Sequence, residues 1–408
     1  MLCRKNRSFT YYINVNQQTH FWHFSRIRHC FLLGLLLIVA YPPAPAASLT
    51  DIPRPVSDAA VRLVQYCSDS KTGLDEQAVD TLVDYVLTSK NSREHSLPKS
   101  NRCVGAYYEF DTEIAFPRFM EYSYSSLIPA SITRPSSLRY SVWSNPGSNM
   151  QKVPGSWSAI PSGGAPVVIR GLRHDSNTPD LSTGVYYEYD LKGTLILLNH
   201  KGRQVLISVS KQIDESNVGK KGVILGNDND WTYFYSNEPG TMKTGLGWAK
   251  TYIYDYFSVA VYAETDSSHA MVRTGVFQWL QAGWLGINFV KPGDILKGMK
   301  RFAQSFRMVL ESPRLPAPSQ LTSVYKSLSR MPASDLAGEY AALQQALRSS
   351  AIQAGKISKS EAEKKQSFVD TSKEQMVEEL MLEYLKMTLG KPTPLGKQSS
   401  QFSPATLP

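Results

Sequence analysis

The sequence predicts an α+β protein: an antiparallel β-sandwich or barrel-like body flanked by an N-terminal helical pair and by C-terminal helices. Three observations predict it. Apolar residues recur at helical spacing before residue 90, alternate with a period of two between residues 104 and 291, and return to helical spacing after Pro292. A run of strands followed by a run of helices is typical of the α+β class.

Residues 1–46 have the pattern of a secretory signal peptide. The segment is basic, contains no Asp or Glu, and includes an uncharged run of twelve residues, Cys30–Tyr41. This run is shorter than the roughly 20 residues that span a bilayer. Prolines follow it, and small residues predict cleavage after Ala46 or Ala47. We therefore expect export to the periplasm or cell envelope; the alternative is an uncleaved membrane anchor over residues 30–47.

The leader also carries much of the positive charge. The chain has 44 Lys and Arg against 35 Asp and Glu, and five of the basic residues precede residue 47. The remainder is close to balanced, and an exported protein of that charge is not expected to bind nucleic acid.

Two cysteines, Cys67 and Cys103, follow the leader. An even pair in an oxidising compartment predicts one disulfide between them. The alternative is two buried free thiols, because pairing does not follow from sequence alone.

Residues 47–103 are expected to form an N-terminal helical segment. Ala60, Val64 and Cys67 share one helix face, and a second apolar face follows a break at Thr72-Gly73. A polar stretch over residues 91–101 separates this pair from the strands.

Residues 104–291 are expected to form the antiparallel β domain. The clearest strands are those of alternating or β-branched composition: Val185–Leu191, Val205–Val209, Val223–Leu225, Trp231–Tyr235, Tyr252–Glu264 and Met271–Phe277. Residues 144–166 and 171–184 lack periodicity and are predicted to be loops.

Residues 292–390 are expected to form the C-terminal helical region. The first helix starts near Asp294 and ends before Pro313, and three helical segments follow. The last is predicted to open with a capping box at Thr371–Glu374. Residues 391–408 are expected to be a disordered tail.

Common catalytic motifs are absent. The sequence has no Gly-x-Ser-x-Gly, His-Glu-x-x-His or Cys-x-x-Cys, and the glycines of Gly240–Gly245 lack the Lys and Ser/Thr of a phosphate loop. No cofactor is expected.

One polar segment, the Arg170–Asp180 loop, offers candidates for catalysis. His174, Asp175 and Asp180 are candidate acid–base groups, and Arg170 and Arg173 are candidates for binding an anionic or polyol substrate. The alternative is a solvated loop between strands.

Asp228 and Asp230, in the stretch Asn227–Asp230, are candidate calcium ligands. The stretch lacks the glycine and glutamate of the helical calcium loop. A hairpin turn explains the same residues, and we expect no metal.

Aromatic residues crowd the β domain and indicate a sugar-stacking platform or an amphiphile cavity. The alternative is ordinary cross-strand packing. The candidate ligand-binding aromatics are Trp231, Tyr233, Tyr252, Tyr254, Trp279 and Trp284.

Basic residues follow one face of the helix over residues 294–311. Such a helix can contact an anionic membrane surface, or can dock its apolar stripe on the sheet. The leading hypothesis is an exported, non-catalytic envelope protein that binds an amphiphile, glycan or protein partner through its β domain. The alternatives are an envelope hydrolase that uses the Arg170–Asp180 loop, and a structural or interaction protein that acts through its C-terminal helices.

Overall fold

The computed structural model describes residues 49–69, 71–89, 92–143, 164–243, 247–265, 270–358 and 371–395. The predicted leader, its cleavage site at Ala46 and most of the predicted tail lie outside these residues, as do residues 144–163. The chain divides into units 1–48 and 49–408, and everything below concerns the second. Within the described ranges, no helix combines the length and apolar character needed to cross a membrane.

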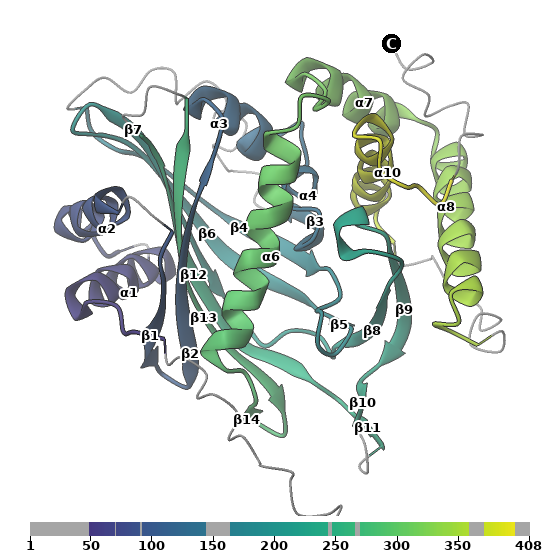
Figure 1. Ribbon diagram of the computed structural model, residues 1–408, viewed down its shortest axis with the longest axis horizontal. Coiled ribbons are helices and arrows are strands. Elements are labelled where there is room, and N and C mark those ends of the chain that lie inside the picture. Colours follow the sequence, from purple (N-terminus) through teal and green to yellow (C-terminus); the bar gives the residue numbers. More distant parts are fainter. Residues whose placement is uncertain are drawn as a thin grey trace, which may run out of the picture. The chain divides into compact units, whose positions relative to one another are not determined.

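One large antiparallel sheet forms the body of this unit, with nine strands among the described residues. Figure 1 shows the sheet with helices on both sides. In spatial order its strands are β1 (Glu94–Ser100), β2 (Cys103–Thr112), β13 (Val272–Trp284), β12 (Tyr252–Glu264), β7 (Arg203–Gln212), β6 (Glu188–His200), β4 (Val167–Asn177) and β3 (Leu138–Trp143), and β14 (Ile287–Asn288) pairs with β13.

Helices α1 (Arg54–Ser68) and α2 (Glu76–Thr88) cover one face of the sheet (Figure 1). The Asp75 carboxylate caps α2 by accepting a hydrogen bond from the backbone N–H of Ala78 at 2.9 Å. The core under these helices is built from large apolar side chains, among them Ile207, Val209, Phe257, Val259, Val261, Phe277 and Trp279.

Helix α6 (Pro292–Leu310) crosses the opposite face, together with α3 (Phe116–Tyr124) and α4 (Ala130–Thr133) (Figure 1). As predicted, α6 ends before Pro313. Its apolar stripe, including Ile295, Met299 and Phe306, is buried. The apolar face of this basic helix is thus occupied by the body of the protein.

The described residues also form two small sheets and three further α-helices. One sheet contains β5 (Val185–Tyr186), β8 (Lys220–Ile224) and β9 (Tyr233–Pro239), and the other contains β10 (Thr241–Lys243) and β11 (Gly247–Ala249). Helices α7 (Pro318–Arg330), α8 (Ala333–Gln353) and α10 (Lys373–Thr388) follow.

The C-terminal helices bury their apolar faces. Helix α10 packs against α7, α8, β3 and α4. None of the six large apolar side chains that are exposed among the described residues belongs to these helices. An interaction role through an uncovered apolar face of these helices therefore gains no support.

The fold class is confirmed: the protein is α+β, with a large antiparallel sheet, an N-terminal helix pair and C-terminal helices. Several local predictions were wrong. The polar stretch over residues 91–101, predicted to separate the helical pair from the strands, contains strand β1, which pairs with β2, and helices α3 and α4 lie within the predicted β domain. Residues 171–177, predicted to be a loop, complete strand β4, which pairs with both β3 and β6. The N-cap of α10 is Ser372, not Thr371, because the Ser372 hydroxyl accepts the hydrogen bond from Gln375 N–H at 3.1 Å.

The predicted disulfide between Cys67 and Cys103 is also wrong, because both side chains are free, buried thiols. The Cys67 thiol points to the carbonyl oxygens of Lys192 and Val209, at 3.5 and 3.8 Å. The Cys103 thiol points to the carbonyl oxygen of Asp255 at 3.9 Å. The two sulfurs thus point to different strands of the sheet. The disulfide was predicted from an oxidising compartment and an even number of cysteines, and neither observation says how far apart the two thiols lie.

A candidate ligand-binding cavity between the sheet and helix α6

A cavity of about 590 Å³ lies between the sheet and α6. Strands β4, β6, β7, β12 and β13 supply one wall, and the first three turns of α6 supply another. The volume falls within the range of roughly 300–1,000 Å³ that is typical of small-molecule sites.

Small side chains on this face of the central strands create the space. A row of paired residues runs across the sheet from β6 to β2: Gly193, Ser210, Ser258, Gln278 and Ala106. The adjacent row contains Ser208 paired with Ala260. Because successive residues of a strand point to opposite faces, the residues of these rows all face α6. Apart from Gln278 they are short, so they leave the volume beside the helix unfilled.

The cavity opens between the turn after β4 and the start of α6. The exposed lining residues include Leu181 in that turn, which is 57% exposed, and Phe289 just before α6, which is 52% exposed. Lys297, on the first turns of α6, also lines the opening, and its side chain is 73% exposed. Apolar side chains therefore flank the entrance, with a cation beside them.

The part of the cavity next to α6 is apolar. Val276 and Leu280 of β13 lie on the sheet side, and Ile295, Met299 and Phe302 lie on the helix side. Ile295 and Met299 are buried. These five side chains form a hydrophobic wall between the entrance and the far end.

The wall formed by β4 and β12 is polar and charged. Arg173 donates to both carboxylate oxygens of Asp175, each at 2.8 Å, and the Ser141 hydroxyl donates to the same carboxylate at 2.7 Å. Burial raises the pKa of both Tyr189 and Tyr256. Their hydroxyls therefore stay neutral and can donate as well as accept hydrogen bonds.

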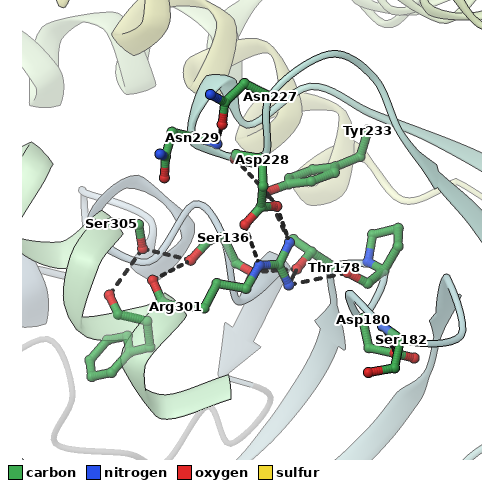
Figure 2. A network of polar contacts seen from close by, with 12 residues as sticks. Ser136, Thr178, Asp180, Ser182, Asn227, Asp228, Asn229, Tyr233, Arg301 and Ser305 are labelled. Carbon is green, nitrogen blue, oxygen red and sulfur yellow. Dashed lines mark hydrogen bonds and ion pairs between the residues drawn. The ribbon is translucent and has the colours of Figure 1, made fainter. Parts of the chain in front are cut away.

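An ion-pair network fixes α6 over the cavity (Figure 2). Arg301 of α6 donates to both carboxylate oxygens of Asp228, at 2.7 and 2.5 Å, and to the Thr178 hydroxyl at 3.2 Å. One turn further on, the Ser305 and Ser136 hydroxyls are 2.6 Å apart. These contacts connect the helix to the turn after β4, to the segment that carries Asp228 and to Ser136.

The same network accounts for the predicted calcium candidates. Asp228 and Asp230 lie on a short 3-10 helix, and the Asn227 side chain caps it by accepting from Asn229 N–H at 2.9 Å (Figure 2). Asp228 is occupied by Arg301. The described part of the chain contains no group of three or more His, Cys, Asp or Glu side chains placed to hold a metal ion.

The three catalytic candidates are not brought together. His174 Nδ1 is 2.7 Å from the Asp190 carboxylate and lies outside the cavity lining. Asp175 lines the cavity but is paired with Arg173. Asp180, at the entrance, accepts hydrogen bonds from the backbone of its own turn, at Ser182 N–H and Thr183 N–H.

Of the ligand-binding candidates, Arg173 and Trp284 line the cavity. Arg170 instead lies over the Tyr66 ring of α1, 4.0 Å from its centroid. Trp279 is fully buried on the α1–α2 side, stacked on Phe257 at 5.1 Å.

The remaining four aromatic candidates lie outside the lining. Trp231 is buried beneath Lys391, and Tyr233 hydrogen-bonds to Arg301 at 3.2 Å. Tyr252 and Tyr254 stack on each other with ring centroids 6.0 Å apart.

Sequence reasoning missed Arg134 and the serines Ser208, Ser210 and Ser258. Serines at alternate strand positions predict a polar face, which is usually a solvated one. Here α6 lies over that face, so its serine side chains line a cavity instead of facing solvent. Arg134 follows α4, a helix of four residues that carries no periodic signal.

No protein-family model matches the sequence, and no curated protein matches it. Among solved structures, the human StarD13 (DLC2) lipid transfer and protein localization domain matches with a TM-score of 0.24 and 8% identity, over 58% of this chain and 95% of that domain. A similarity at this level carries no inference about this protein.

Proposed function

We propose that the protein binds an amphiphile in the cavity between the sheet and α6. The observation that carries the proposal is the space left by Ser208, Ser210 and Ser258, which is closed on one side by α6 and has both an apolar and a polar wall. A largely preformed, mostly apolar pocket with a few converging polar groups is the usual form of a small-molecule site.

The polar groups support binding rather than turnover. The described lining includes no His or Cys side chain. The carboxylate buried in it, Asp175, is held by Arg173 and Ser141, so it is poorly placed to exchange protons with a substrate. The basic, proline-terminated leader supports placing this binding activity in the periplasm or cell envelope.

Filling the cavity tests the proposal. The double variant S210L/S258L places two large side chains on the cavity face of β7 and β12. Titration of the wild type with the apolar fluorophore N-phenyl-1-naphthylamine should give saturable fluorescence, and the double variant should bind at least about tenfold more weakly, because it loses more than the roughly 1.4 kcal/mol that this ratio represents.

The matched control is S334L, which makes the same exchange at an exposed site at the start of α8. It should bind the fluorophore as the wild type does. A folded S210L/S258L protein, by circular dichroism, that binds with wild-type affinity would show that the ligand does not occupy this cavity.

A further inference from the structure

Away from its entrance, the charged side chains that line the cavity do not cancel. Among the described residues they are Arg134, Arg173, Asp175, Asp180, Asp294, Lys297 and Arg301. Asp180, Asp294 and Lys297 lie at the entrance. Away from it, Arg173 is neutralised by Asp175 and Arg301 by Asp228. That accounting leaves Arg134.

Arg134 is held at the end of the cavity opposite the entrance. Strand β12 runs from Ile253, paired with Ala282 near the entrance, to Tyr262, paired with Thr274. Arg134 interacts with Tyr262. Its backbone N–H donates to Ser131 O at 3.3 Å at the end of α4, and its side chain is positioned by a hydrogen bond from Nη2 to the Tyr124 hydroxyl.

Most hydrogen-bond donors of the Arg134 guanidinium have no acceptor among the described residues. A guanidinium carries five N–H donors and stays charged. In the described structure its hydrogen bond goes from Nη2 to the Tyr124 hydroxyl at 3.2 Å, and its enclosed Nε has no acceptor. No carboxylate of the described residues forms an ion pair with it. A buried cation without a counter-charge is costly, so this site favours an anion.

The neighbouring acids cannot supply that anion. Asp175 is the acid that acts on Arg134 electrostatically, and it is already bound through both oxygens by Arg173. Glu378 accepts a hydrogen bond from Ser131 of α4 at 2.8 Å. Burial raises the pKa of Glu378 to about 8, so this carboxyl is mostly protonated at neutral pH.

We infer that the ligand is an anionic amphiphile, whose carboxylate or phosphate head pairs with Arg134 while its apolar chain lies along Val276, Leu280, Met299 and Phe302 towards the entrance. Ser208, Ser258 and Tyr256 line the cavity and offer hydroxyls for the remaining oxygens of the head group. This inference rests on the proposed function and adds the ligand class. A guanidinium suits both carboxylate and phosphate, since it can donate two parallel hydrogen bonds.

The test compares an anionic probe with its neutral form. Delipidated full-length protein is titrated with dansyl-labelled undecanoic acid and with the methyl ester of the same compound. The wild type should bind the acid at least about tenfold more tightly, because only the acid can form a hydrogen-bonded ion pair with the guanidinium. In R134Q the affinity for the acid should fall to that for the ester, and the affinity for the ester should stay within about twofold.

Competition identifies the source of the anion. Lysophosphatidic acid should displace the dansyl acid, lysophosphatidylcholine should do so at least about tenfold less well, and inorganic phosphate should not displace it at the same concentrations. Displacement by inorganic phosphate as effective as that by lysophosphatidic acid would mean a free-anion site and would overturn the inference.

Controls separate this inference from the proposed function. R118Q removes an exposed cation of α3, with a side chain 50% exposed, and should bind both probes as the wild type does. Equal wild-type affinity for acid and ester overturns the anion inference but leaves amphiphile binding intact, whereas failure to bind either probe overturns both. If R134Q does not fold, R134K replaces it and should bind the acid more weakly than the wild type, because an ammonium lacks the paired donors. An R134K protein that binds the acid as tightly as the wild type would contradict the assigned role of the guanidinium.

Discussion

The two faces of the central strands differ in their side chains: one face is packed as core and the other lines a cavity. On β7 and β12 the side chains that face α1 and α2 are large, as in Ile207, Val209 and Val259, and they close the core. The alternate side chains face α6 and are short, as in Ser208 and Ser258, and they leave a cavity. The difference shows that the size of the side chains on a covered sheet face decides whether that face becomes packed core or leaves a cavity.

Both faces of the sheet bury charged side chains. On the α1–α2 side, Arg93 is paired with Glu109 at 2.9 Å and Arg273 with Asp111 at 2.6 Å. Next to the cavity, Arg139 is paired with Glu379 at 2.7 Å, and Glu378 is buried with hydrogen bonds from the Ser131 hydroxyl and the Ser141 N–H. Burying such groups stabilises a fold little or not at all. The α6 side differs in that Glu378 is held by hydrogen bonds and forms no ion pair among the described residues.

The largest expected effect of this difference is a dependence of stability on pH that comes from Glu378. Burial raises the pKa of its carboxyl to about 8 in the folded protein, above the ordinary value of 4.5. The folded state therefore keeps a proton that the unfolded chain releases between these pH values, so stability falls as pH rises through this window. Between pH 5 and 8.5, urea unfolding should show the wild type losing about 3–4 kcal/mol relative to E378Q, which has no proton to lose.

The control for this effect is E374Q, at an exposed position on the first turn of the same helix. Its stability should follow the pH curve of the wild type. If E378Q and the wild type have parallel curves from pH 5 to 8.5, the carboxyl ionises normally and the accounting of charge around Arg134 would have to change.

An intermediate effect on stability is expected when an alanine on each face of β12 is replaced by leucine. Ala263 of β12 is fully buried in the α1–α2 core, and Ala260 of the same strand lines the cavity. A263L should cost about 1–3 kcal/mol, because the new side chain has no room. A260L should cost less than about 1 kcal/mol, because the cavity accepts it. Chemical denaturation gives the free energy of unfolding of both variants. Equal losses would show that the α6 side is as tightly packed as the α1–α2 side.

Much of the fold could be predicted from the sequence because both periodicities are strong. The alternation of Tyr252–Glu264 and the helical spacing from Asp294 each correspond to one element of the structure. Residues 171–177 of β4 were predicted to be a loop because polar residues occupy both faces there: Arg173 and Asp175 line the cavity, and His174 lies beside Asp190. Pairing with β3 and β6 on both sides decides their conformation.

The site could be predicted only in part. An amphiphile cavity was among the hypotheses, yet most of the selected aromatic residues lie elsewhere, because Tyr and Trp suit ordinary sheet packing as well. What makes the cavity is the pairing of short residues across strands far apart in sequence, as in Ser210 with Ser258. That register is not visible along a single strand, and neither is the isolation of Arg134 from carboxylates.

The smallest expected effect concerns the two thiols on the packed face. Cys67 and Cys103 lie in the core under α1 and α2. Burial raises the pKa of both thiols, that of Cys103 to about 12, so little reactive thiolate is present at pH 8. Reductant should leave the melting temperature of the purified protein unchanged, and iodoacetamide should modify these two residues only after denaturation, as peptide mass spectrometry would show. A disulfide across this loop would contribute about 3–4 kcal/mol, so a drop of several degrees on reduction would contradict the free-thiol arrangement. Dense packing on the α1–α2 side should thus keep both thiols unreactive with and without reductant. The cavity on the α6 side, in contrast, stays accessible to solutes between Leu181 and Phe289.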